Sequence, residues 1–134
     1  MNFLLDTNIV SFYFRGNSKV ESKLLSYSLE NIFISCISYF ELIAGYANSV
    51  PEWRQKSLQK VEDFTSLVEV IGIEKKVAKT AGLIKADLVK KGQTIEDADL
   101  LIGATCLVCN LVLVTNNVKH FKRIPDLKIQ DWTI

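Results

Sequence analysis

Short apolar runs alternate along this chain with segments whose apolar residues recur every three or four positions. Runs of the first kind predict buried strands, and segments of the second kind predict helices that pack one face against a core. The predicted strands cover residues 2–5, 32–36, 67–71, 111–115 and 127–130. The predicted helices cover residues 9–13, 18–25, 38–47, 51–64, 77–88 and 98–109, and a further helical turn is expected near Phe121.

This alternation of strands and helices predicts an α/β fold. Strands that are joined through helices pair in parallel and are covered on both faces, which explains why they are apolar almost throughout. No internal repeat, low-complexity tract or linker interrupts the pattern, so residues 1–134 are expected to form a single domain. In sheets of this kind, ligands bind beyond the carboxyl ends of the strands.

Composition and charge narrow the class of protein only slightly. The chain has 134 residues, of which 49% are apolar and 23% charged, as in ordinary globular domains. Sixteen basic and fifteen acidic residues give a net charge of +1, so nucleic-acid binding would need a local basic patch. One candidate patch is the set of six lysines between Lys75 and Lys91, although a solvated helix face is the simpler interpretation. The other is Lys119, His120, Lys122, Arg123 and Lys128.

The chain is expected to be a soluble, cytoplasmic protein. Asp6 interrupts the apolar start, which argues against a signal peptide, and no apolar run is long enough to span a membrane. Three cysteines, an odd number, suit a reducing compartment. Cys106 and Cys109 form a C-x-x-C pattern, but both fall in an apolar helix without a second such motif. We therefore interpret them as core residues rather than as a redox or zinc site.

Asp99 is the most unusual charge in the sequence. It is the only charged residue in the otherwise apolar helix predicted at residues 98–109. A carboxylate at the edge of a core lowers stability unless a cation or hydrogen-bond donors meet it. Lys90 or Lys91 folding back onto Asp99 is one explanation, and a bound metal ion is another.

Asp99 belongs to a set of polar residues at equivalent places in the predicted fold. Asp6 follows the first strand, Glu41 lies in the first turn of the helix after the second strand, and Asn117 follows the fourth strand. If these ends converge at one edge of the sheet, all four side chains face one crevice. Crowded carboxylates repel one another, and their hard oxygen ligands favour magnesium or manganese. His120 is the only histidine, which argues against zinc.

Each of these residues also has a purely local interpretation. Asp6 can cap the first helix, and Asn117 can be an ordinary turn residue. Glu41 fits a capping box with the serine three residues before it, as Asp97 does with Thr94. The set as a whole therefore supports a site better than any one member does.

Four sequence blocks, taken in order, resemble the PIN domain. They are LLDTN at residues 4–8, ELIAG at 41–45, DLLIGA at 99–104 and VTNN at 114–117. Their spacing and the closing Asp131-Trp132 resemble the VapC-type toxins of bacterial toxin–antitoxin pairs. Each block alone is a weak signal, but all four in order along essentially the whole chain are a strong one.

The resemblance implies a three-layer α/β/α fold with a central, mainly parallel sheet of four to five strands. It also implies a magnesium-dependent ribonuclease, with manganese as a possible substitute. Carried over by position, the metal-binding acids are Asp6, Glu41 and Asp99. Asn117 would complete the catalytic set, at a position where many PIN domains place a fourth acid. Two supporting hydrogen-bonding residues would be Asn8 and Thr115.

The same resemblance implies a reaction and partners. A water activated by the metal would attack a phosphodiester of tRNA or rRNA, leaving a 3′-hydroxyl and a 5′-phosphate. Candidates for phosphate contacts are Lys119, Lys122 and Arg123. The expected partners are a cognate antitoxin, whose tail would enter the acidic groove, and a second copy of the chain. Aromatic residues are candidates for these surfaces, although core packing is the simpler interpretation; they are Phe12, Tyr13, Phe14, Tyr46 and Trp53.

Two departures and two alternative functions remain open. Gly103 stands where alanine is usual in the family, and His120 stands where an acid is common. A phosphohydrolase with an aspartyl nucleophile, similar to the haloacid dehalogenase family, would need an aspartate where Asn8 stands. A catalytically silent PIN-like module that only binds RNA or protein is the other alternative, against which the intact acidic set argues.

Overall fold

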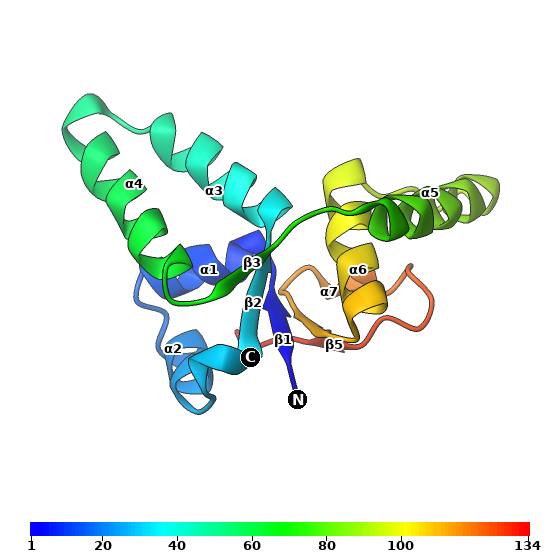
Figure 1. The fold of residues 1–134 in the computed structure, drawn as a ribbon, viewed down its shortest axis with the longest axis horizontal. Coiled ribbons are helices and arrows are strands. Elements are labelled where there is room, and N and C mark those ends of the chain that lie inside the picture. Colours follow the sequence, from blue (N-terminus) through cyan, green and yellow to red (C-terminus); the bar gives the residue numbers. More distant parts are fainter.

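Five short strands form one central sheet. The computed structural model describes residues Met1–Ile134, and all strand pairs in it are parallel, in the order β3-β2-β1-β4-β5 (Figure 1). The strands are β1 (Phe3–Leu5), β2 (Ile32–Ser35), β3 (Glu69–Ile71), β4 (Val112–Val114) and β5 (Ile129–Gln130). The parallel sheet is confirmed, but each strand is one or two residues shorter than its predicted run.

Helices cover both faces of this sheet, which confirms the three-layer α/β/α architecture (Figure 1). The helices are α1 (Thr7–Phe14), α2 (Ser18–Leu25), α3 (Cys36–Ala47), α4 (Pro51–Thr65), α5 (Lys75–Lys90), α6 (Asp97–Cys109) and α7 (Val118–Phe121). A single 3-10 turn, η1 (Leu29–Asn31), leads into β2. Pro51 begins α4, as expected for a residue that has no N–H to leave unpaired.

Alternate residues of each strand enter different cores. Phe3 and Leu5 pack in a cluster with buried residues of α1 to α4, whereas Leu4 packs in a second cluster with Ile102 of α6 and Phe121 of α7. This alternation follows from the two-residue period of a strand. All of these side chains are buried, so the sheet has no solvent-facing side at its centre.

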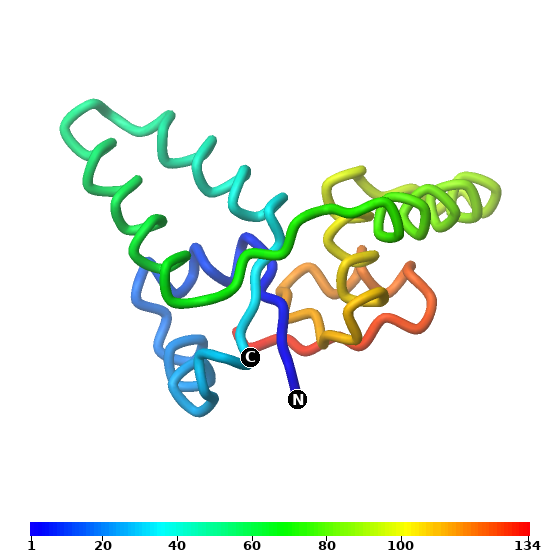
Figure 2. Tube along the Cα trace, viewed as in Figure 1, coloured from blue at the N-terminus to red at the C-terminus, as the bar shows by residue number.

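The central pair of strands joins the two ends of the chain. β1 pairs with β4, and the backbone N–H of Asp6 continues the ladder by donating to the carbonyl of Val114 at 2.9 Å. Near the other end, the Trp132 ring packs edge-on against Phe3 with ring centroids 5.2 Å apart. The trace in Figure 2 accordingly brings the first and last residues to the same region of the molecule.

The capping residues of three helices differ from those that the sequence indicated. Ser35 caps α3 by accepting from the N–H of Ile37 at 3.0 Å, so Glu41 lies in the second turn and its predicted capping box is wrong. The capping box of Asp97 is also wrong: Asp97 begins α6 and instead pairs with Lys85 at 2.7 Å. At α2, Asn17 rather than the following serine caps the helix.

The central helix α6 carries the two cysteines of the C-x-x-C pattern. Cys106 is buried, which raises the pKa of its thiol, and it packs as a core residue. Cys109 is exposed at the end of the helix, so its interpretation as a core residue is wrong. Neither α6 nor any other helix combines the length and the apolar character needed to cross a membrane.

Candidate active site

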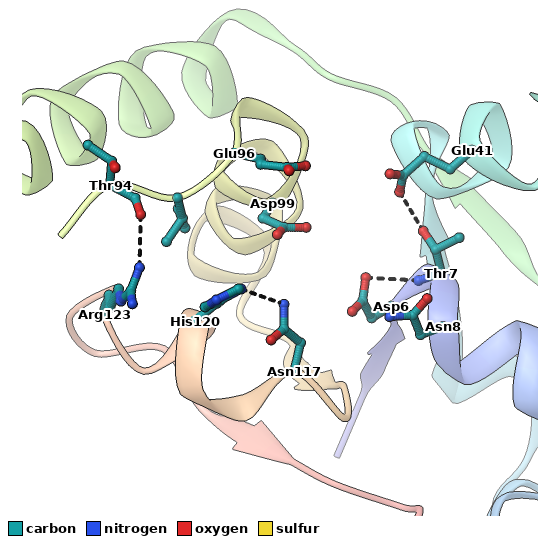
Figure 3. Close-up of a pocket in the computed structure, with 11 residues that line it drawn as sticks. Asp6, Thr7, Asn8, Glu41, Thr94, Glu96, Asp99, Asn117, His120 and Arg123 are labelled. Atoms are coloured by element: carbon teal, nitrogen blue, oxygen red, sulfur yellow. Dashed lines mark hydrogen bonds between the residues drawn. The ribbon is translucent and has the colours of Figure 1, made fainter.

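The predicted crevice exists at the carboxyl edge of the sheet. A cavity of about 520 Å³ opens between the end of β1, helices α3 and α6, and the turn that leads into α7 (Figure 3). Its lining residues are Asp6, Thr7, Asn8, Glu41, Thr94, Ile95, Glu96, Asp99, Asn117, His120 and Arg123. The structure thus brings six of the predicted site residues to one cavity, and it adds a fourth carboxylate, that of Glu96. The six are Asp6, Asn8, Glu41, Asp99, Asn117 and Arg123.

Asp6 is the most deeply placed of these carboxylates. It is 5% exposed, and it caps α1 by accepting from the N–H of Thr7 at 2.9 Å. Its other carboxylate oxygen accepts from the hydroxyl of Thr115 at 2.8 Å, the supporting contact expected from the sequence. Burial raises the pKa of Asp6, these two hydrogen bonds lower it, and repulsion from Glu41 raises it. The pKa of Asp6 is raised overall, so the effect of burial is larger than that of the two hydrogen bonds.

Glu41 reaches the cavity from α3. The Thr7 hydroxyl donates to Glu41 Oε1 at 2.6 Å and lies 2.9 Å from the hydroxyl of Ser38, which is buried inside the helix. This contact spans 34 residues, so it fixes α3 against the start of α1. Glu41 therefore contacts a residue of another helix at the cavity and does not cap its own helix.

Asp99 lies in the first turn of α6, half-buried at the rim of the core. Its pKa is raised to about 6, chiefly by burial. Repulsion from the carboxylates of Asp6, Glu41 and Glu96 contributes further. The N-terminal end of a helix favours a negative charge, so burial and repulsion must outweigh that effect. The alternative explanation, a pairing of Asp99 with Lys90 or Lys91, does not hold, because the only ion pair in the molecule joins Lys85 and Asp97.

Asn117 connects the acidic residues to the opposite side of the cavity. Its backbone N–H donates to the Thr115 hydroxyl at 2.9 Å, and its side-chain Nδ2 lies 2.9 Å from His120 Nδ1. It stands at the N-cap of α7 without capping it through its side chain. Asn117 is therefore more than a turn residue, since both its main chain and its amide take part in contacts at the site.

The predicted phosphate contacts separate into two groups. Arg123 lines the cavity, and its Nη1 donates to the carbonyl of Thr94 at 2.9 Å, across 29 residues. Lys119 and Lys122 are exposed nearby but do not line the cavity. Arg123 thus belongs to the site itself, whereas the two lysines border it.

Whether the residues fit a divalent cation can be judged from the donor set. Four carboxylates, two side-chain amides and no cysteine line the cavity, which is the chemistry that hard divalent ions bind. No lysine lines it, and no carboxylate there is neutralised by an ion pair. No three acidic, histidine or cysteine side chains are yet close enough to hold an ion between them. The ligand atoms are therefore of the type that binds a hard divalent ion, and they line one cavity. They are not arranged around a single point in it.

Sequence reasoning missed two residues of the site, Thr7 and Glu96. Thr7 donates a hydrogen bond to Glu41, and no local sequence pattern predicts a contact between residues so far apart. Glu96 offered a detectable signal, because it lies three residues before Asp99, and residues at that spacing lie on the same side of a helix.

A parallel α/β/α sheet with this acidic cavity at its carboxyl edge defines a class of protein. The profile of the family described as "PIN domain" matches residues 3–127 of the sequence. The chain therefore belongs to the PIN-domain family.

Comparison with individual proteins over nearly the whole chain narrows the similarity to one group within this family. It is 36% identical to ribonuclease VapC1 of Haemophilus influenzae (strain R2866), with 99% of both chains covered. It is 33% identical to the tRNA(fMet)-specific endonuclease VapC of Salmonella typhimurium (strain LT2), with 98% of both chains covered. Among solved structures, VapBC2 from Rickettsia felis bound to a DNA fragment from its promoter superposes with a TM-score of 0.90. That match has 33% identity and covers 98% of this chain and 99% of the other.

Proposed function

We propose that this chain is a magnesium-dependent endoribonuclease, able to use manganese, that acts as the toxin of a toxin–antitoxin pair. The observation that carries the proposal is the cavity lined by four carboxylates, none of which forms an ion pair. Full-length similarity to proteins named ribonuclease and tRNA(fMet)-specific endonuclease supports RNA as the substrate. Transfer RNA and ribosomal RNA are the candidate targets.

Asp6, Glu41 and Asp99 would hold the ion. When bound, it would supply Lewis-acid stabilisation for a phosphodiester and lower the pKa of an attacking water. The protein's part is to keep the acids in place: Thr115 orients Asp6, and Thr7 orients Glu41. Asn8, which is exposed on the cavity wall, is a proposed supporting donor.

Substrate binding needs positive groups beside these acids. Arg123 lines the cavity, and a guanidinium has five N–H donors, so its contact with Thr94 leaves others for a phosphate. Lys119 and Lys122 are exposed beside the cavity and are proposed to contact the RNA backbone further along. Single-stranded segments suit this arrangement, because the acids must reach one phosphodiester closely.

The test is cleavage of a mixed tRNA and rRNA pool with magnesium or manganese. We expect discrete products with wild type that are absent with EDTA and with Asp99→Asn. Asp97→Asn is the matched control, because Asp97 lies two residues away on α6 but pairs with Lys85 outside the cavity. Products that persist in Asp99→Asn would place the chemistry elsewhere. A folded wild type that cleaves nothing would favour the catalytically silent binding module.

The proposed partners are an antitoxin and a second copy of the chain. The solved neighbours include a VapBC complex, which supports an antitoxin partner. Four of the five aromatic candidates pack partly into the core, as the simpler interpretation had it, whereas Trp53 on α4 is 55% exposed. Co-purification with the product of a neighbouring small reading frame would test the first partner. Sedimentation that shows only monomer at high concentration would contradict the second.

A further inference from the structure

The cavity has two chemically different walls. The carboxylates come from the end of β1, from α3 and from the start of α6, while His120 and Arg123 face them from α7 and the turn after it (Figure 3). His120 is the group whose role the family resemblance leaves open. The hydrogen bonds around it indicate what it does.

The contact with Asn117 selects one form of the His120 ring. Asn117 Nδ2 lies 2.9 Å from His120 Nδ1, and an amide NH₂ group can only donate. With the amide in this orientation, Nδ1 accepts and carries no hydrogen. In a neutral imidazole the single hydrogen is then on Nε2, the nitrogen that Asn117 does not contact.

The same contact fixes the ring relative to the acidic residues. The Thr115 hydroxyl donates to Asp6, the Asn117 N–H donates to that hydroxyl, and the Asn117 amide holds the ring. Three consecutive contacts of 2.8 to 2.9 Å thus connect His120 to the deepest carboxylate. These contacts give the His120 ring a defined position relative to the carboxylates, although His120 is not one of the acidic residues.

His120 Nε2 has no partner of its own. No carboxylate forms an ion pair with the ring, and the side chain is exposed on the cavity wall. A phosphodiester is an anion, so it needs donors where it enters a cavity with four carboxylates. Arg123 supplies some of these donors, and the Nε2–H of His120 is a further donor on the same wall.

We propose that His120 is a substrate-binding residue whose Nε2–H donates to a phosphate oxygen of RNA in this cavity. Asn117 is its positioning residue, since it sets the tautomer and the place of the ring. The inference rests on the proposed ribonuclease function and assigns two of its residues. It gives Asn117 a task that an acid at that position would perform poorly, because a carboxylate would accept from Nδ1–H and select the other tautomer.

The single histidine makes the first measurement direct. In untagged, ¹⁵N-labelled protein, the only imidazole signals belong to His120. Long-range ¹H–¹⁵N spectra should show the Nε2–H tautomer in wild type and a mixture of tautomers in Asn117→Ala. Adding a short single-stranded RNA of mixed sequence, with EDTA to prevent cleavage, should shift the Nε2 signal. A wild-type ring in the Nδ1–H tautomer would overturn the inference.

The second measurement separates binding from chemistry. With RNA as substrate, His120→Ala should raise KM about 10-fold or more with kcat changed less than about threefold, because a hydrogen bond to a charged phosphate is lost. His120→Gln, which returns an N–H donor near the place of Nε2, should recover most of that loss. His120→Asn, whose shorter side chain cannot reach it, should not. Lys23→Gln, an exposed change on α2, is the control and should match wild type.

The outcomes distinguish this inference from the function on which it rests. Cleavage by wild type together with an unchanged KM in His120→Ala would overturn the inference and leave the nuclease standing. An Nε2 signal that responds to RNA in a folded protein that cleaves none would support the contact and reject the nuclease.

Discussion

Asp99 is a residue whose charge opposes folding. Its pKa is raised to about 6 in the folded chain, against about 3.9 for an unperturbed aspartate, so the folded state binds more protons between these values. The free energy of unfolding should therefore fall as pH rises from about 4 to about 6, and stay lowered above that.

Replacing Asp99 by asparagine tests this sign. Asp99→Asn should be more stable than wild type at pH 8 by about 1 kcal/mol, after allowance for solvent screening of a half-exposed group, and nearly equal at pH 4.5. Urea denaturation at the two pH values measures both differences. Asp97→Asn is the control, and a stability gain for Asp99→Asn that is equal at both pH values would contradict the assignment.

Thr115 is the residue on which the deepest part of the site depends. Its hydroxyl donates to Asp6 and accepts from the N–H of Asn117, and its side chain is fully buried. Thr115→Val leaves both partners without that contact, so we expect a loss of about 1.5–3 kcal/mol in urea denaturation.

A second buried threonine provides the matched control. Thr105 donates to the carbonyl of Leu101 one turn back in α6, an acceptor that the helix itself already uses. Thr105→Val should therefore change stability by less than about 1 kcal/mol. Similar losses in the two variants would show that burial alone, and not the contact with Asp6, decides the effect.

Two glycines within helices differ in what surrounds them. A Cβ on Gly82 of α5 meets nothing within 4 Å, whereas a Cβ on Gly103 of α6 would lie 2.6 Å from Ile124 Cδ1. Gly82→Ala should stabilise by about 0.5–1 kcal/mol through helix propensity. Gly103→Ala should be at least about 1 kcal/mol less stable than Gly82→Ala, because buried Ile124 must shift. Thermal unfolding of both variants checks this, and equal gains would contradict it.

The strands were predictable from sequence, whereas the helix starts were not. A buried parallel strand must be apolar on both sides, so β1 and β4 are visible as apolar runs. A helix start depends on which serine reaches a free N–H, and Ser35 and Ser38 are equally plausible until the backbone is known. Pattern alone therefore located the elements to within a few residues and found the start of α1 and α4, but it misassigned the caps of α2, α3 and α6.

Some residues of the site were likewise predictable from the sequence and others were not. Asp6 and Asn117 were predictable because a strand end fixes their place in a parallel sheet. Thr7 and the contact between Arg123 and Thr94 were not, since these contacts join residues 34 and 29 positions apart. The type of residue at one position does not determine which distant segment of the chain will contact it.

At the scale of the molecule, the unneutralised cavity predicts that a divalent ion stabilises the fold. Manganese at about ten times its Kd should raise the melting temperature of wild type by roughly 5 °C at pH 8. The rise should be smaller at pH 5, because protons compete at Asp99 with its pKa of about 6. Differential scanning fluorimetry measures this, and an equal rise in Asp99→Asn would place the ion elsewhere.

The central position of β1 has a consequence for synthesis of the chain. Asp6 leaves the ribosome 109 positions before its partner Thr115. Until β4 emerges and pairs with β1, Asp6 lacks this donor, and Asn117 and His120 have not arrived. A ribosome that stalls before that point therefore carries only a partial site, so interrupted translation of the proposed toxin would yield fragments that lack Thr115, Asn117 and His120.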